Sequence, residues 1–289
     1  KQALTMCMGF GCNAAGVIGC RIIDSPREKL ISIITNAFVP CNGRFPFLIT
    51  IAMIFFAGEL SSGLASVVST LAVMVVVLIG IMLTFAISNI LSKTILKGVS
   101  SSFILELPPY RKPQIGKILF RSIFDRTLFV LARAISVAAP AGIVIWIMAN
   151  LQISDISLLT YVANFLDPFA KLMGLDGYIL TAFILGFPAN EIVLPIILMC
   201  YMQTGVLVDM ENTQSIGKIL IENGWTWLTA INTMIFTLLH FPCSTTTLSI
   251  KKESGSWKWA GIAFALPTVT GITFCMITTF VAHMFAYIT

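Results

Sequence analysis

Charge is scarce in this sequence: only 11% of its 289 residues are charged, and only two are histidine. Soluble domains carry about a quarter charged residues and about half apolar residues. Here 57% of the residues are hydrophobic, and the mean hydropathy is +0.93. This balance excludes an ordinary soluble domain and indicates an integral membrane protein. Because the alternation typical of membrane-spanning strands is also absent, we expect an all-α protein.

Motifs of enzymes and nucleic-acid-binding proteins are missing too. The sequence has no GxxxxGK[ST] phosphate loop, no HExxH helix and no Ser-His-Asp set of a membrane hydrolase. We therefore expect no enzyme activity and no resident cofactor within these residues. The net charge of +5 is spread over short loops instead of being gathered with aromatic residues, so we expect no nucleic-acid partner.

Disulfides and targeting segments are not indicated either. Seven cysteines is an odd number, and most of them lie in or beside apolar runs, which favours free thiols. The chain begins at Lys1 without an initiator methionine or a signal-peptide pattern, so we expect a fragment of a longer protein.

Long apolar runs dominate the chain. The runs Leu64–Leu91, Leu128–Leu151 and Trp259–Tyr287 each exceed the roughly 20 residues that cross a bilayer as a helix. The main polar segment between them is basic, and the positive-inside rule assigns it to the cytoplasm. We therefore expect a multi-pass protein embedded in the lipid bilayer. Its predicted parts are a first repeat unit, a cytoplasmic connector and a second repeat unit, at residues 1–92, 93–126 and 127–289.

Helix breakers interrupt the remaining apolar segments. GFPANE, from Gly186 to Glu191, breaks the apolar run Tyr178–Met202, because proline removes a backbone donor and leaves carbonyl groups free. The flanking segments 152–176 and 203–224 are rich in acidic residues, so we expect exterior loops there. The run between them must then enter and leave on the same face, which predicts a re-entrant hairpin.

The same features occur in the first unit. GFGCNA, from Gly9 to Ala14, repeats the Gly-Phe-x-x-Asn frame of GFPANE. A Pro-Cys pair at 40–41 breaks one helix, and a second Pro-Cys pair at 242–243 breaks another. The charge pattern gives these two helices opposite directions across the membrane. We therefore predict inverted-topology repeats, which place a transporter's substrate site at the midplane, where the broken helices meet.

Side chains at these breaks are candidate metal ligands. Cys12, Cys41 and Cys243 lie at breaks, whereas Cys275 lies in an unbroken run. Thiols beside freed carbonyl groups suit a borderline transition metal better than sodium or potassium. Glu191 adds a carboxylate whose depth in an apolar run requires a compensating partner, and a cation is suitable. Further candidates along the ion path are Asn13, Asn42, Asn190, Ser244 and Thr245.

Plainer interpretations stay open for each of these residues. A free cysteine often behaves as a small buried apolar residue, and Glu191 is equally suited to a structural or proton-relay role. We expect at least one of Asn13 and Asn190 to cap a half-helix instead of binding an ion. His240 is a weaker metal candidate because the first unit has no equivalent histidine, and we expect His283 at the membrane interface.

Five motifs occur in a defined order along the chain. They are GFGCN at 9–13, SPREKL at 25–30, FVPC at 38–41, ELPPYR at 106–111 and GFPANE at 186–191. Together they resemble the membrane domain of FeoB-type ferrous iron transporters, and the resemblance covers nearly the whole chain. It implies that the ion is Fe(II) and that a cytoplasmic GTPase domain, which would bind GTP, precedes this chain. It places the family's candidate iron positions at Cys12, Cys41, Glu191 and Cys243.

The sequence thus predicts a transporter of a divalent transition-metal ion, with Fe(II) favoured by the resemblance, in the bacterial cytoplasmic (inner) membrane. The alternative is a nucleoside-type or other organic-solute carrier, because such carriers also use inverted repeats with hairpins. That alternative predicts aromatic and amide ligands in place of thiols. Thiol and carboxylate donors accept several metals, and the sequence is compatible with an oligomer.

Overall fold

The computed structural model describes residues 1–57, 62–96, 98, 114–116, 120, 128–153, 156–207 and 212–288. Most of the connector 93–126, including the ELPPYR motif, lies outside the described residues. Within them the protein is predominantly helical, as the composition predicts, and the described strands form one short antiparallel hairpin in which Gln152 pairs with Ser157.

The first unit consists of helices that are interrupted where the sequence predicts. Its elements are α1 (Gln2–Gly11), α2 (Asn13–Gly19), η1 (Cys20–Ile22), α3 (Pro26–Thr35), η2 (Asn36–Phe38), α4 (Phe45–Ala57) and α5 (Ser62–Lys93), where η marks a tighter 3-10 helix. Ser25 caps α3 by accepting a hydrogen bond from the N–H of Glu28, and Pro26 takes the first helical position, where a missing N–H costs nothing.

The second unit is longer and contains the β-hairpin. Its elements are α7 (Phe129–Asn150), β1 (Gln152–Ile153), β2 (Ile156–Ser157), α8 (Leu158–Leu172), α9 (Gly177–Leu185), η4 (Asn190–Ile192), α10 (Val193–Met202), α11 (Thr213–Glu222), α12 (Trp227–Leu239), α13 (Ser244–Ser254) and α14 (Trp257–Ile288). Ser157, Asp176 and Thr226 cap α8, α9 and α12 by accepting hydrogen bonds from first-turn N–H groups.

The chain leaves α-helical geometry at each of the predicted breaks. Cys12 separates α1 from α2, and residues 39–44 separate η2 from α4. Residues 186–189 separate α9 from η4, and residues 240–243 separate α12 from α13. Gly or Pro lies at each of these helix ends, in agreement with their local effect on the backbone.

The segments on either side of the GFPANE run differ from the predicted exterior loops. Residues 152–176 hold the β-hairpin and α8, and residues 203–224 include α11. Two of the acidic residues that suggested a loop bond to the start of a helix instead: Asp167 accepts a hydrogen bond from the N–H of Gly177 at 3.1 Å, and Asp176 accepts one from the N–H of Ile179 at 2.7 Å. Carboxylates at a helix N-terminus are stabilised by the helix dipole, so acidity here does not require a loop.

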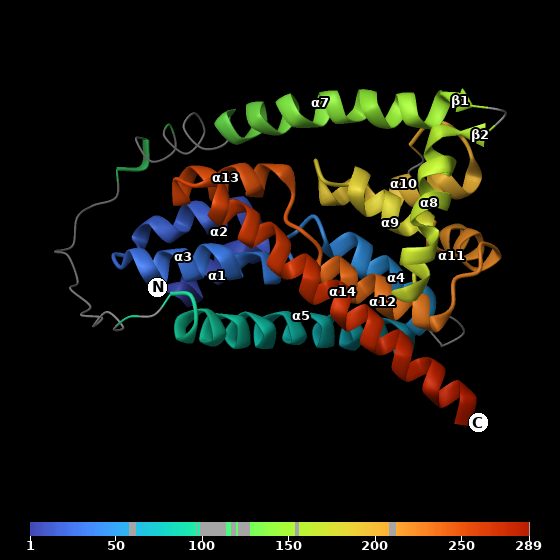
Figure 1. Ribbon diagram of the computed structural model, residues 1–289, viewed down its shortest axis with the longest axis horizontal. Helices are drawn as coiled ribbons and strands as arrows, with labels where there is room; N and C mark the ends of the chain where they lie inside the picture. The colour runs from blue at the N-terminus through green and yellow to red at the C-terminus, as the bar shows by residue number, and fades with distance from the viewer. Residues whose placement is uncertain are drawn as a thin grey trace.

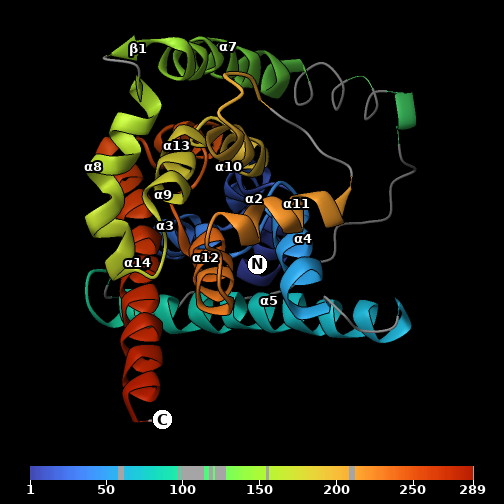
Figure 2. The ribbon, with the colours of Figure 1, turned by 90° about the vertical axis from the view of Figure 1, so that its right-hand side faces the viewer.

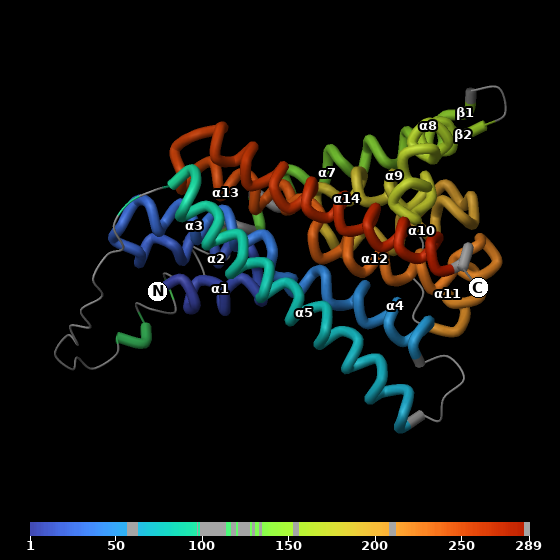
Figure 3. The backbone as a smooth tube through the Cα atoms, turned by 60° about the horizontal axis from the view of Figure 1, so that its bottom comes forward, coloured from blue at the N-terminus to red at the C-terminus, as the bar shows by residue number. Residues whose placement is uncertain are grey.

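Helices α5 and α7 lie on opposite sides of the molecule, with the broken helices between them (Figures 1 and 2). Helices α1, α2, α3 and α13 gather at one end, and α8 to α11 gather at the other (Figure 1). Along this axis the chain runs from α3 to α4 in one direction and from α12 to α13 in the opposite direction. Helix α5 runs obliquely past α3 and α4 and packs against them (Figure 3), while α14 packs against α12, α13 and α3.

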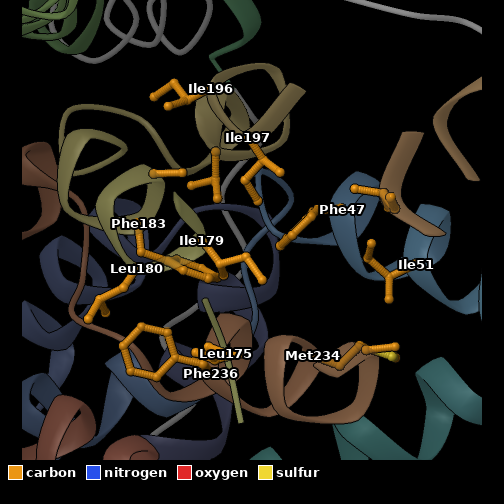
Figure 4. Close-up of a cluster of buried hydrophobic side chains, with 14 of the residues drawn as sticks. Phe47, Ile51, Leu175, Ile179, Leu180, Phe183, Ile196, Ile197, Met234 and Phe236 are labelled. Atoms are coloured by element: carbon orange, nitrogen blue, oxygen red, sulfur yellow. The ribbon is translucent and has the colours of Figure 1, made fainter. Parts of the chain in front are cut away.

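The main hydrophobic core joins helices from both units (Figure 4). Phe183 of α9 packs edge-on against Phe236 of α12, with ring centroids 4.9 Å apart, and against Phe47 of α4 at 6.1 Å. Ile51 of α4 and Ile197 of α10 belong to the same cluster and are fully buried. The units therefore form one packed body around the region where the helices break.

Two of the described helices are long and apolar enough to cross a membrane: 63–93 within α5 and 257–285 within α14. The pair formed by α8 and α9 meets the same test together, with a bend of 109° between them. The apolar stretch of α7 found by this test is shorter, at 135–150. A membrane protein with broken helices agrees with these lengths.

Candidate ion site at the helix breaks

In the first unit, the GFGCNA break packs against the Pro-Cys break of the next helix. Cys12 has an extended backbone, with φ −154° and ψ 123°. The N–H of Asn42 donates a hydrogen bond to the carbonyl of Gly11 at 3.3 Å. With its amide nitrogen turned toward neighbouring carbonyl groups, Asn13 donates to the carbonyl of Val39 at 3.2 Å. Asn13 therefore bridges the two breaks and does not cap α2.

The second unit has a similar arrangement, in which the hairpin carbonyl that accepts the hydrogen bond lies one motif position earlier. Ala189 occupies the position of Cys12 in the motif and has nearly the same backbone conformation, with φ −151° and ψ 124°. The N–H of Ser244 donates to the carbonyl of Phe187 at 2.8 Å, as the N–H of Asn42 does to the first hairpin. The buried Ser244 hydroxyl donates to the carbonyl of Pro188 at 3.2 Å.

Asn190 connects the two units at the centre. Its amide nitrogen lies 3.8 Å from Sγ of Cys41, and its amide oxygen lies 3.2 Å from Nε2 of His240. Nδ1 of His240 lies 2.9 Å from the carbonyl oxygen of Thr237. Both ring nitrogens of this buried histidine are thus engaged, so His240 supports Asn190 and the end of α12 in this conformation. Asn190 makes no cap hydrogen bond to η4.

The three break cysteines lie in one region but in different environments. Cys12 is exposed, Cys41 is buried, and Cys243 is half-buried with Sγ 3.2 Å from Oγ1 of Thr246. In the part of the chain that the structure describes, no three His, Cys, Asp or Glu side chains are grouped so as to hold a metal ion.

Glu191 is exposed, whereas its sequence context predicts a deeply buried carboxylate. Its side chain lies against Gly43, because a Cβ added to Gly43 would be 3.0 Å from Cγ and 3.1 Å from Oε1 of Glu191. Among the described residues the carboxylate has no hydrogen-bond or ion-pair partner. A residue of the second unit thus places an open carboxylate beside the backbone that follows Cys41.

The remaining ion-path candidates are Asn42, which is exposed, and Thr245, which is half-buried. In the same threonine run, the hydroxyl of Thr247 donates to the carbonyl groups of Pro242 and Cys243 at 3.3 and 3.1 Å. The threonine run therefore satisfies part of the backbone at the break. His283 is exposed in the last turns of α14.

The sequence analysis missed Arg44, the largest of the fully buried side chains. Its guanidinium donates hydrogen bonds to the carbonyl oxygens of Ala37, Leu238, His240 and Phe241, at 3.3, 2.8, 3.1 and 3.2 Å. The carbonyl groups at the Pro-Cys break of the second unit, which were expected to be free, are therefore already bonded to Arg44. The only signal in the sequence was a single arginine between the Pro-Cys break and the apolar helix α4.

This geometry is that of a helical membrane protein whose broken helices pack against one another near the centre of the molecule. Two family models match the chain: Gate, described as "Nucleoside recognition", over residues 131–257, and FeoB_C, described as "Ferrous iron transport protein B C terminus", over residues 73–125. The second model gives residues 73–125 a likeness to the FeoB family, and the relatives described next extend that likeness over nearly the whole chain.

Proteins from several organisms are similar to nearly the whole chain. A protein named Fe(2+) transporter FeoB from Staphylococcus aureus is 31% identical over 294 residues, covering 99% of this chain and 41% of the relative. A protein of that name from Methanocaldococcus jannaschii is 26% identical, covering 98% of this chain and 42% of the relative. A fusion of Fe(2+) transport protein A with FeoB from Porphyromonas gingivalis is 25% identical, covering 90% of this chain and 35% of the relative. The chain thus spans about two fifths of the length of the first two relatives. No solved structure matches it.

Proposed function

We propose that this chain forms the path by which a transporter moves Fe(II) across the cytoplasmic membrane. The names of the relatives support Fe(II) as the substrate. The observation that carries the proposal is the convergence of both hairpin breaks and both Pro-Cys breaks on one central region. The breaks carry the thiols of Cys12, Cys41 and Cys243 and the carboxylate of Glu191, which has no hydrogen-bond or ion-pair partner among the described residues.

The proposed architecture is a pair of inverted repeats, each with a re-entrant hairpin. The matching backbone angles of Cys12 and Ala189 support it. So do the similar hydrogen bonds from Asn42 and Ser244 to the hairpins of their own units. The opposite directions of α3–α4 and α12–α13 in Figure 1 agree with inversion. In transporters of this kind the substrate binds between the repeats.

The end of the molecule that holds η1 and the start of α3 is proposed to face the cytoplasm. Arg21 and Lys29 lie there with Glu253 of α13, and Arg27 donates to the carbonyl of Ser92 near the end of α5 at 3.3 Å. Lys93, Lys251 and Lys252 lie on the same helix ends, and a concentration of basic residues marks the cytoplasmic side. The connector 93–126 leaves from this end.

Fe(II) is suited to the donors that meet at the centre. It accepts thiolate sulfur and carboxylate oxygen, and sulfur favours it over hard cations. Cys41 belongs to the first unit and Cys243 to the second, so an ion bound by both would link the units. Movement of one unit relative to the other would then open this site to each side in turn. A GTP-binding domain preceding this chain, as the resemblance implies, would drive or gate that movement.

Uptake into liposomes by the full polypeptide that carries this chain tests the proposal. Fe(II), Zn(II), Mn(II) and a nucleoside are offered in parallel, and Fe(II) uptake is expected. Cys41→Ser and Cys243→Ser should reduce it, whereas Cys275→Ser should not, because Cys275 is buried on α14 and donates only to the carbonyl of Asn232 at 3.4 Å. Equal losses in all three variants would assign the break cysteines to packing. Uptake of the nucleoside alone would instead favour the organic-solute carrier.

A further inference from the structure

The end of α12 is capped by two side chains, and one of them comes from the other unit. The final carbonyl groups of a helix lack partners within the helix. Here the N–H of His240 bonds to the carbonyl of Phe236 at 2.7 Å, and Nδ1 of His240 lies 2.9 Å from that of Thr237. Arg44 takes the next carbonyl, that of Leu238, at 2.8 Å. A cation at this position also opposes the negative end of the helix dipole.

Arg44 continues beyond the helix end into the break itself. Its second terminal nitrogen donates to the carbonyl oxygens of His240 and Phe241 at 3.1 and 3.2 Å. The same guanidinium reaches back to Ala37 in its own unit at 3.3 Å. Carbonyl oxygens from both units are therefore gathered around one buried positive charge. Such a group of oxygens is what a bound cation would otherwise require.

Hard cations depend on oxygen ligands of this kind. Ca²⁺ takes about 6–8 oxygens, many of them backbone carbonyls, and transporter sites for Na⁺ use the carbonyls of unwound helices. At this break a tethered guanidinium already holds those oxygens, and its charge repels any second cation placed among them. The donors nearby are of another kind: the thiol of Cys41 lies three residues before Arg44, that of Cys243 lies two residues after Phe241, and Glu191 lies against Gly43, the residue that precedes Arg44.

We propose that Arg44 determines ion specificity by occupying the carbonyl oxygens of the Pro-Cys break in the second unit, so that oxygen-preferring cations find no site there. An arriving ion must then bind through sulfur with few oxygens, which favours softer transition metals. This inference rests on the proposed function for its transport consequence. Its consequence for cation binding is independent of transport.

Three substitutions in the full polypeptide separate charge from hydrogen bonding. Arg44→Met removes both, Arg44→Gln keeps amide donors without the charge, and Arg44→Lys keeps the charge on a compact group. Binding is measured as the shift in melting temperature that Ca²⁺ produces in detergent. Transport is measured as Fe(II) uptake into liposomes with Ca²⁺ as competitor. Monodisperse elution identifies the variants that fold.

The wild type and Arg44→Lys should show no thermal shift with Ca²⁺ and no competition by Ca²⁺. Arg44→Met and Arg44→Gln should be stabilised by Ca²⁺, and the preference for Fe(II) over Ca²⁺ should fall roughly tenfold or more, which corresponds to about 1.4 kcal/mol. Arg44→Met leaves buried carbonyl groups unpaired and can fail to fold for that reason. In that case the comparison of Arg44→Gln with Arg44→Lys decides whether the charge of Arg44 excludes Ca²⁺.

Folded Arg44→Gln that neither binds Ca²⁺ nor loses preference for Fe(II) would overturn the inference and leave Arg44 a structural clamp. If the wild type moves no Fe(II), the proposed function fails, but the thermal shifts still decide whether Arg44 occupies a cation site. The two failures are therefore distinguishable.

Discussion

Glu253→Gln should weaken the contact between the units at their basic end. The carboxylate of Glu253 accepts hydrogen bonds from Nε and Nη2 of Arg21 at 2.9 and 2.5 Å and lies 3.8 Å from Nζ of Lys29. The side chain of Glu253 is 5% exposed, whereas that of Arg21 is 58% exposed. Breaking a buried pair costs about 3–5 kcal/mol, and an exposed pair contributes about 0.2–1 kcal/mol. In this pair only the Glu253 side chain is buried, and solvent screens the charge of Arg21, so the pair should contribute about 1–2 kcal/mol.

The same contact predicts a dependence on pH. Burial alone would raise the pKa of Glu253, but the hydrogen bond and charge of Arg21, together with Lys29 and Lys252, outweigh it and lower the pKa below the ordinary 4.5. A carboxyl group with a lowered pKa stabilises the folded state above its unfolded pKa. This stabilisation is lost as the pH falls through the folded pKa. The wild type should therefore lose stability below about pH 4.5, and Glu253→Gln should lack this loss.

Thermal unfolding in detergent, from neutral pH downward, measures both effects. A loss of about 1–2 kcal/mol should lower the melting temperature by about 2–6 °C. Arg21→Met should cost a similar amount, and the double variant should cost little more than either. Asp24→Asn is the matched control, since the Lys1–Asp24 pair leaves Asp24 86% exposed, and it should change nothing measurable. Additive losses in the double variant, or an equal loss in the control, would refute the reasoning.

Three further substitutions test the centre of the molecule. Gly16→Ala should cost about 1–3 kcal/mol in unfolding experiments, because its Cβ would lie 2.6 Å from Oδ1 of the buried Asn36, whereas Gly11→Ala, with nothing within 4 Å, should be tolerated. Asn190→Leu should preserve the helical circular dichroism spectrum and lower Fe(II) uptake, because the thiol beside it loses its polar partner; full uptake would make that contact dispensable. Glu191→Gln should lower uptake roughly tenfold, or about 1.4 kcal/mol, without changing the melting temperature, and unchanged uptake would place the carboxylate outside the ion path.

Features that depend on the local backbone could be predicted from the sequence. The breaks near Gly9, Pro40, Gly186 and Pro242 occur where the sequence predicts them, because glycine and proline weaken a helix locally and are combined at these four positions with polar residues. Long apolar runs likewise correspond to α5, α7 and α14. Overall composition was enough to predict a helical membrane protein.

Features that depend on contacts between distant segments could not be predicted. Asp167 accepts a hydrogen bond from the N–H of Gly177 only because α8 folds back toward α9, so acidity alone suggested a loop. Arg44 is buried because carbonyl groups almost 200 residues away satisfy it, and the order of residues gives no sign of that pairing. The exposure of Glu191 likewise depends on how η4 meets the first unit.

Iron K-edge X-ray absorption on the full polypeptide, loaded anaerobically with Fe(II) in detergent, tests the central claim most directly. The account predicts sulfur neighbours of iron at about 2.3 Å, a distance typical of metal–thiolate bonds. That signal should disappear in the Cys41→Ser, Cys243→Ser double variant and persist in Cys275→Ser. Iron surrounded only by oxygen and nitrogen in the wild type, or a sulfur signal that survives in the double variant, would contradict it.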